Sequence, residues 1–446
     1  LFASVLFGSG GWLALHLGEG HCTFAGAALF PYLVLFHRRA LDEREWLIPL
    51  GAVAAWIVAL GGTSTPPMAM VLLATVASID AYRRRSLSPY LNLFAAGVAA
   101  ALIGAVRLVP ALQFVFDHPR HLFETDANSI IDIIRNAYEW RGVEAVRGKR
   151  YWFHEYGYRL SYLTPPLILW SLTIKKTRAW WIVAGVGAGI VAGSAIPYGP
   201  WWLMSRLPIF RDLRVPSRYA LLIALAMPIV CGGALDDLLA RLEKWRGPRS
   251  RRLVAIAVVT LALLDGLAFD AFCFHKVFEL RLPIAVQGTP FYQEQGTWRS
   301  MMNLVMQNQG AIKCDEEAPL ERALELDTGE VPQVRLLDPG AGAVRAIRWT
   351  PNRIEADLDL QQPTTVMFNQ NWNEHWRATT GTVVRVGPKV AMDHDGGRLG
   401  VKAPAGRYTL AVYYRPRSFV IGACVSALSI VLALFMFISA RKRRVT

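Results

Sequence analysis

The sequence predicts a polytopic α-helical membrane protein of about ten membrane segments, with an extracytoplasmic β-sandwich-like domain before the last helix. Apolar stretches alternate with short basic connections along most of the chain. The 446 residues are 53% hydrophobic, include 15 Trp and have a mean hydropathy of +0.28, which is too apolar for a soluble chain of this length. A region near the C-terminus instead alternates apolar and polar residues with a period of two, which indicates half-buried strands.

The predicted membrane segments are apolar stretches that approach the length of about 20 residues needed to cross a bilayer. They cover residues 1–16, 22–37, 46–62, 66–82, 91–115, 159–174, 179–196, 218–238, 252–272 and 418–440. The first nine segments make residues 1–272 a multi-spanning membrane domain. The last is a C-terminal transmembrane helix.

Charge at the segment ends predicts the orientation. About nineteen of the 48 Lys and Arg residues lie in five connections, which cover residues 38–44, 83–85, 175–178, 241–252 and 441–444. Basic connections stay in the cytoplasm, so residues 441–446 form a cytoplasmic tail. The loops at 17–21, 116–158 and 197–217 and a domain at 273–417 then lie outside.

The outer domain at residues 273–417 is predicted to be mainly β. Residues 344–360 alternate apolar and polar side chains on both sides of a turn at Pro351 and Asn352. Four further runs repeat this pattern, at 364–372, 382–387, 398–404 and 407–414, with Gly, Asp and Pro between them. Short strands at this spacing favour a small sandwich.

The net charge of +14 would suggest a nucleic-acid partner in a soluble protein. Here much of the excess lies at membrane edges, where topology and anionic lipid explain it, so the bilayer is the expected partner and nucleic acid is not. The five cysteines show no metal-binding spacing. Cys273 and Cys314 share the outer domain, where oxidation could pair them, and unpaired small hydrophobic residues are the alternative.

The first segment begins at Leu1 with no basic anchor and lacks the charged region and cleavage site of a signal peptide. We therefore expect the chain to be a fragment whose N-terminal helices precede it.

The first outer connection carries Glu19 and His21 between two predicted segments, with Gly18 and Gly20 allowing a tight turn. A carboxylate and an imidazole at the membrane rim could exchange a proton or hold a divalent ion that bridges a phosphate. The alternative is a solvated turn that caps a helix.

The sequence YWFHEYGYRL gathers His154, Glu155, Tyr156 and Tyr158 at the end of the second outer loop. These residues could form a sugar-binding platform, in which rings stack on the sugar and Glu155 accepts from hydroxyls. An interfacial aromatic belt is the alternative. Arg107 lies inside an apolar stretch, which calls for a partner or a water-filled cavity, unless the side chain snorkels to the surface.

The third outer loop, SRLPIFRDLRVPSRY, is rich in arginine although it faces outward. Guanidinium groups bind phosphates bidentately, so the loop is suited to a phosphate-bearing lipid headgroup. The alternative is an internal salt-bridge set with contacts to ordinary lipids. The candidate residues are Arg206, Arg211, Asp212, Arg214 and Arg218.

The motifs LHLGEGHCTF, RLVPALQF, HEYGYRL, PIFRDLRVPSRYALL and FNQNWNEHWRAT occur in an order that resembles YfhO-type bacterial membrane proteins. These in turn resemble GT-C glycosyltransferases, which use polyprenyl-phosphate sugars. The resemblance implies inverting transfer of a sugar from a lipid carrier to a cell-envelope glycan or lipid, at the outer face of the bacterial cytoplasmic membrane. The sequence establishes no cofactor, although a divalent cation, Mg²⁺ or Mn²⁺, could assist the transfer.

The family's catalytic carboxylate lies in a first large outer loop, and this sequence has no such loop. Glu19, His21 and Glu155 are therefore supporting candidates, and the general base is not assigned. Binding of the carrier is expected of Arg107, His154, Tyr156, Tyr158 and the arginine loop. A non-catalytic membrane protein that binds or moves lipid-linked glycans is the alternative, because fold resemblance by itself does not establish catalysis.

Overall fold

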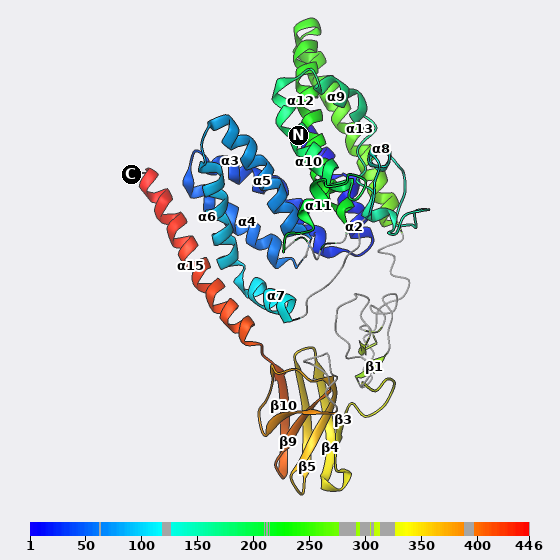
Figure 1. The fold of residues 1–446 in the computed structure, drawn as a ribbon, viewed down its shortest axis with the longest axis vertical. Coiled ribbons are helices and arrows are strands. Elements are labelled where there is room, and N and C mark those ends of the chain that lie inside the picture. The colour runs from blue at the N-terminus through cyan, green and yellow to red at the C-terminus, as the bar shows by residue number, and fades with distance from the viewer. Residues whose placement is uncertain are drawn as a thin grey trace. The chain divides into compact units, whose positions relative to one another are not determined.

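The computed structural model describes residues 1–61, 64–117, 126–208, 210, 213, 215–275, 291–294, 304, 307–312, 326–387 and 397–445. The chain forms two compact units (Figure 1). The helical unit comprises residues 1–108, 121–279 and 425–446, and the sheet unit comprises residues 109–120 and 280–424.

The helices are short on average, and several 3₁₀ turns connect them. The α-helices are α1 (Phe2–Gly8), α2 (Gly11–Gly18), α3 (Phe30–Ala40), α4 (Leu47–Ala59), α5 (Thr65–Arg84), α6 (Ser88–Ile103), α7 (Ala105–Asp117), α8 (Ile130–Asn136), α9 (Thr164–Ser171), α10 (Arg178–Val191), α11 (Pro200–Met204), α12 (Ala220–Arg246), α13 (Pro248–Phe274) and α15 (Arg417–Val445). The 3₁₀ turns are η1 (Cys22–Leu29), η2 (Arg44–Trp46), η3 (Phe153–Glu155), η4 (Lys175–Thr177), η5 (Pro216–Tyr219) and η7 (Pro339–Ala341).

Helix α12 is the buried centre of the helical unit. It packs against α1, α9, α10 and α13 (Figure 1). Leu222, Ala226 and Val230 on this helix have no exposed surface. A second group of helices, α3 to α6, packs together and meets the first through the contact between α5 and α10. Burial of apolar surface, at about 25 cal/mol per Å², stabilises both groups.

The prediction of ten membrane segments is wrong. Three described helices are long and apolar enough to cross a membrane: Pro216–Arg246, Pro248–Phe274 and Arg417–Ser439. Helices α6 and α7 would make a fourth span if taken together, although they meet at an angle of 88°. At 1.5 Å per residue, the 13 residues of α4 extend about 20 Å, which is short of the roughly 30 Å hydrocarbon core.

The error arises because hydropathy counts apolar residues across helix breaks. Predicted segment 1–16 is divided between α1 and α2 at Ser9 and Gly10, and predicted segment 22–37 begins as the 3₁₀ turn η1. Predicted segment 159–174 contains the eight-residue helix α9. In each case the apolar side chains are used partly to pack short helices against one another.

The sheet unit contains two four-stranded antiparallel sheets, and the period-two runs of the sequence form six of these eight described strands (Figure 1). Their orders are β4-β5-β10-β7 and β3-β6-β9-β8, and the strands of a separate parallel pair are β1 and β2. The bounds are β1 (Tyr292–Glu294), β2 (Gln309–Ala311), β3 (Val334–Leu336), β4 (Gly342–Thr350), β5 (Arg353–Leu360), β6 (Thr364–Asn371), β7 (Trp376–Ala378), β8 (Thr382–Val386), β9 (Arg398–Ala403) and β10 (Gly406–Tyr414).

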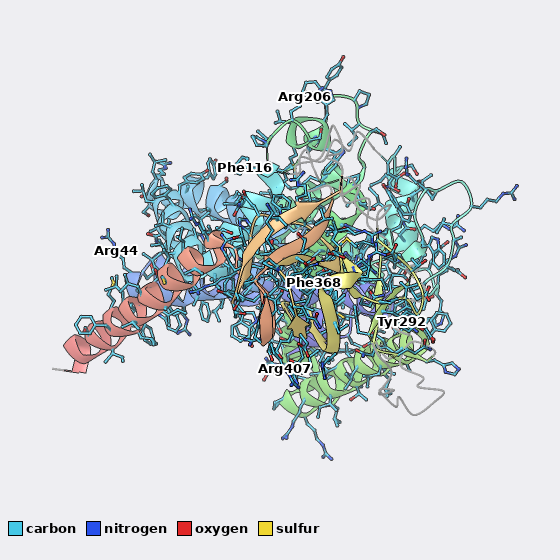
Figure 2. The ribbon with its side chains drawn as sticks, turned by 90° about the horizontal axis from the view of Figure 1, so that it is seen from below. Arg44, Phe116, Arg206, Tyr292, Phe368 and Arg407 are labelled. Atoms are coloured by element: carbon cyan, nitrogen blue, oxygen red, sulfur yellow. The ribbon has the colours of Figure 1, made fainter. Side chains whose placement is uncertain are left out.

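Side chains from both sheets form one core. Residues 354, 356, 358 and 360 of β5 are buried, while the residues between them are partly exposed, as a period of two requires. Phe368 of β6, labelled in Figure 2, has no exposed surface and contributes to the same core from the other sheet. Pro351 and Asn352 form the two-residue turn of the β4–β5 hairpin, in which Thr350 pairs with Arg353.

We expect Leu358→Ala to destabilise the sheet unit by about 2–5 kcal/mol, because the substitution removes fully buried methyl groups from the shared core. Leu337→Ala makes the same chemical change at a side chain that is 57% exposed and should change stability by less than about 0.5 kcal/mol. Hydrogen exchange of the strand amides in the full chain, measured across a urea series, would report both. Equal effects of the two variants would contradict a common core.

Candidate functional site

The first part of the site is the turn between α2 and η1. Gly20 has φ of +87°, a conformation that glycine adopts without strain. The turn is closed by the His21 N–H, which donates to the carbonyl of His16 at 2.9 Å, and by the Cys22 N–H, which donates to that of Gly20 at 2.8 Å. This turn brings the His21 side chain back beside the end of α2.

The second part is η3, which carries His154 and Glu155. The Phe153 N–H donates to the Glu144 carbonyl at 2.7 Å and fixes the start of the turn. Gly157 allows η3 to pack against α2, because a Cβ atom at this position would lie 2.6 Å from Cδ1 of Leu15. His154 and Glu155 are consequently buried, with 6% and 5% of their surfaces exposed.

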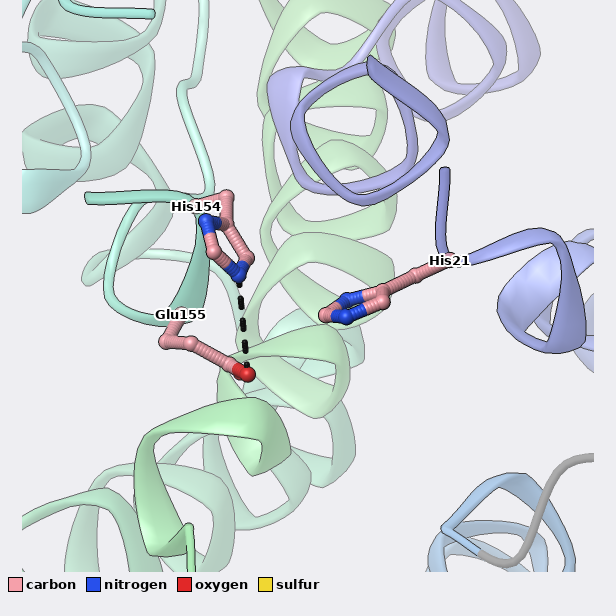
Figure 3. Close-up of side chains that lie close together, drawn as sticks. All are labelled: His21, His154 and Glu155. Atoms are coloured by element: carbon pink, nitrogen blue, oxygen red, sulfur yellow. Dashed lines mark ion pairs between the residues drawn. The ribbon is translucent and has the colours of Figure 1, made fainter. Parts of the chain in front are cut away.

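His21, His154 and Glu155 meet at this packing contact (Figure 3). Each offers one nitrogen or oxygen atom, and the three atoms lie within 4.8 Å of one another. Nε2 of His154 lies 3.6 Å from Oε1 of Glu155, and the imidazole centroids of His21 and His154 are 5.1 Å apart. We call these three residues the His–His–Glu cluster.

Arg218 of η5 approaches the cluster and pairs with Glu155. Its Nε donates to Oε2 of Glu155 at 2.6 Å, its Nη2 donates to Oε1, and its Nη1 donates to Ser64 Oγ at 3.4 Å. Burial favours the neutral carboxyl, but the adjacent guanidinium outweighs this effect and holds the pKa of Glu155 well below its usual range. Glu155 is therefore a buried carboxylate held in a bidentate pair.

Two further ionisable residues border the cluster. His16 of α2 has no exposed surface, and its Nδ1 lies 3.5 Å from Nδ1 of His21. Glu19 is partly exposed, and burial, reinforced by the charge of Glu155 and opposed by His154, raises its pKa. His16 and Glu19 therefore add two ionisable side chains to the surroundings of the cluster.

The cluster supplies two imidazoles and one carboxylate. Imidazole nitrogen suits Zn²⁺ and other transition metals, whereas Mg²⁺ prefers oxygen ligands and octahedral geometry. The set fits Mg²⁺ poorly, and it fits Mn²⁺ or Zn²⁺ better. An imidazole near neutral pH can also accept or donate a proton to a bound molecule.

The structure brings together five of the residues that the sequence suggested for the site, although they come from three distant segments: Glu19, His21, His154, Glu155 and Arg218. Arg211, Asp212 and Arg214 lie outside the described residues, as does Cys314 of the suggested pair with Cys273. Cys273 is buried.

The remaining predicted binding residues lie elsewhere. Tyr156 and Tyr158 are 2% and 3% exposed, so their ring faces are not available to a sugar, and the Tyr158 hydroxyl donates to the Ile133 carbonyl at 2.8 Å. The guanidinium of Arg206 lies 3.5 Å from the ring centroid of Trp202 (Figure 2). Arg107 is exposed, and its guanidinium lies against Gly61, where a Cβ atom would be 3.2 Å from Nη2.

Sequence reasoning missed His16 and Ser64. His16 falls at the end of an apolar run and was counted as part of a membrane segment, although an ionisable residue in such a run is itself a functional signal. Ser64 carried no signal, because its role depends on the approach of Arg218 from a segment 154 residues away.

We expect Glu155→Gln and Arg218→Met each to destabilise the helical unit by about 3–5 kcal/mol, because either change leaves a buried charge without its partner. The double variant should be more stable than the sum of the single effects implies. Thermal unfolding in detergent of the unmodified chain, the two single variants and the double variant gives the four stabilities of a double-mutant cycle. The exposed pair of Glu243 and Arg251, 2.6 Å apart, is the matched control and should couple by less than about 1 kcal/mol. Additive effects at Glu155 and Arg218 would contradict this account.

Comparison of the chain with protein families, with curated proteins and with solved structures finds no match.

Proposed function

We propose that this protein binds a polyprenyl-phosphate-linked sugar at the outer face of the bacterial cytoplasmic membrane and transfers the sugar to a cell-envelope glycan or lipid. The observation that carries the proposal is an apolar groove next to two arginines. Arg107 and Arg218 contact the connection between α4 and α5, which adjoins the groove lining, and Arg218 also pairs with the His–His–Glu cluster. An apolar chain attached to a phosphate matches this arrangement.

The groove lies among α4, α5 and α6 and has a volume of about 500 Å³. This volume is within the range of about 300–1,000 Å³ typical of small-molecule sites. Its lining is apolar throughout and includes Ile57, Met70, Leu93, Phe94 and Leu108. Each methylene group that enters such a groove from water contributes about 0.8 kcal/mol, which suits a hydrocarbon chain.

Positive charge gathers at the connection between α4 and α5. Arg107 adjoins Leu108 of the groove lining and contacts Gly61, and Arg218 donates to Ser64, two residues before Pro66 of the lining. Two guanidinium groups therefore contact one short connection beside the groove. Such groups bind phosphate oxygens through paired, charge-assisted hydrogen bonds.

The His–His–Glu cluster would then face the sugar end of the carrier. Glu155 engages Arg218 with both oxygens, so we assign it to holding that arginine and not to proton transfer. Glu19 is partly exposed, and we assign it the exchange of a proton with the acceptor hydroxyl. A divalent cation bound at the cluster would supply charge stabilisation to the leaving phosphate.

The engagement of Glu155 also favours a second function, in which the chain binds or moves lipid-linked glycans without transferring the sugar. Both functions require the same binding step. They differ in whether substitution of Glu19 abolishes transfer while binding is retained.

We expect Arg107→Ala to weaken binding of a short-chain polyprenyl-phosphate sugar by about tenfold to a hundredfold, since a charged hydrogen bond contributes about 1.5–3 kcal/mol. Arg107→Lys should restore part of the affinity, because lysine keeps the charge but lacks the planar fork. Binding to the purified full chain in detergent can be followed by ligand fluorescence.

The matched control is Arg407→Ala, which removes an exposed arginine of the sheet unit (Figure 2). Its affinity should equal that of the unmodified chain. Equal losses in the Arg107→Ala and Arg407→Ala variants would show that only overall charge matters and would refute the assignment.

The proposed orientation places residues 273–417 outside and the C-terminus in the cytoplasm. In a background with Cys22, Cys314 and Cys424 replaced by Ala, we expect a membrane-impermeant thiol reagent to label Gln361→Cys in intact cells. Lys244→Cys, in a connection assigned to the cytoplasm, should be labelled only after lysis. Both substituted positions are exposed. The reverse pattern would overturn the orientation.

A further inference from the structure

We propose that His21, His154 and Glu155 form a Zn²⁺ site in which Arg218 and His16 orient the ligands. This inference does not depend on the proposed function. It rests on the identity of three side chains, on their separations and on two contacts behind them.

The spacing between His154 and Glu155 is close to the spacing of two ligand atoms on one ion. Their closest atoms are 3.6 Å apart, which exceeds the usual 2.7–3.2 Å or so of an N–H···O hydrogen bond. Ligand bonds of about 2.0–2.1 Å in a tetrahedral zinc site place ligand atoms roughly 3.3 Å apart. The ligand atom of His21 lies within 4.8 Å of the other two, so this partly exposed side chain needs a movement of at most about 1.5 Å to complete the set.

The contact of His21 with His16 suits a metal-bound imidazole. A ligating histidine usually donates its second ring N–H to a neighbouring acceptor, which fixes the tautomer. Nδ1 of His21 lies 3.5 Å from Nδ1 of His16, so that ring nitrogen of His16 can accept when His21 donates. The buried ring of His16, packed edge-on against Trp12 at 4.3 Å between centroids, holds this acceptor in place.

The contact of Glu155 with Arg218 has the same orienting effect on the carboxylate. The bidentate pair keeps Glu155 ionised, as a metal ligand must be, and fixes the plane of its two oxygens. Oε1 points toward His154. The guanidinium also repels a cation, so Arg218 is expected to restrict the site to ions that bind imidazole strongly.

A set of two His and one Glu is the ligand class of zinc sites that leave a fourth position open. The partial exposure of His21 and Glu19 gives that position a route to solvent. Magnesium is disfavoured, since it dehydrates reluctantly and takes oxygen ligands.

The test uses the full chain purified in detergent, stripped with a chelator and titrated with Zn²⁺. We expect one high-affinity site per chain and a rise in the unfolding temperature when Zn²⁺ is added. Co²⁺ should bind in its place and give the intense visible absorption of a tetrahedral site. An excess of Mg²⁺ should not displace it.

Three variants separate ligand roles from structural roles. His21→Gln, at a partly exposed position, should preserve the fold and reduce Zn²⁺ affinity by more than about a hundredfold, and His154→Ala should do the same. His16→Phe should keep one site but weaken it about tenfold to a hundredfold, as loss of an orienting contact does. The control, His275→Ala, removes an exposed histidine and should leave affinity unchanged.

Unchanged Zn²⁺ affinity in His21→Gln, or an equal loss in His275→Ala, would overturn the proposal and indicate adventitious binding at surface histidines. Absence of a stoichiometric site in the stripped chain would also overturn it. Binding of the lipid-linked sugar by the Arg107 variants is measured without metal, so the two proposals can fail separately.

Discussion

The ion pair between Glu155 and Arg218 is the interaction on which the rest of the site depends. It joins η3 to η5, and the same arginine reaches the connection before α5. Each charge compensates for the free-energy cost of burying the other, so the pair adds little net stability. Its main effect is to constrain how η3 and η5 meet. Once it forms, His154 lies beside the turn that carries His21.

This constraint connects the polar cluster to the apolar groove. Ser64, which accepts from Arg218, precedes α5, and α5 forms one wall of the groove with α4 and α6. This arrangement is typical of a binding site for an amphiphilic ligand, in which an apolar surface holds the chain of the ligand and a few fixed charges orient its polar end. A shift of η5 would affect both places, because Arg218 contacts Glu155 of the cluster and Ser64, which lies two residues before Pro66 of the groove lining.

The outcome for the helices differs from the outcome for the strands for a physical reason. The period-two runs predicted six of the eight described strands of the two four-stranded sheets, and the turn at Pro351 and Asn352, because alternation reports directly on which face of a strand is buried. An apolar run in the sequence indicates that its side chains are buried, but it does not show whether lipid or other parts of the protein cover them. The runs at 1–16 and 159–174 therefore looked like membrane spans, although their helices are short and partly packed on α12 and α13.

The sequence by itself determined the apolar character of the chain, most of its described strands and the identity of the chemically capable residues. Only the tertiary structure decided which of these residues meet. Glu155 and Arg218 are 63 positions apart, and no local pattern encodes a contact at that separation. The structure also decided against Tyr156 and Tyr158 as a sugar platform, because whether an aromatic ring packs inside or faces a ligand depends on the segments that cover it.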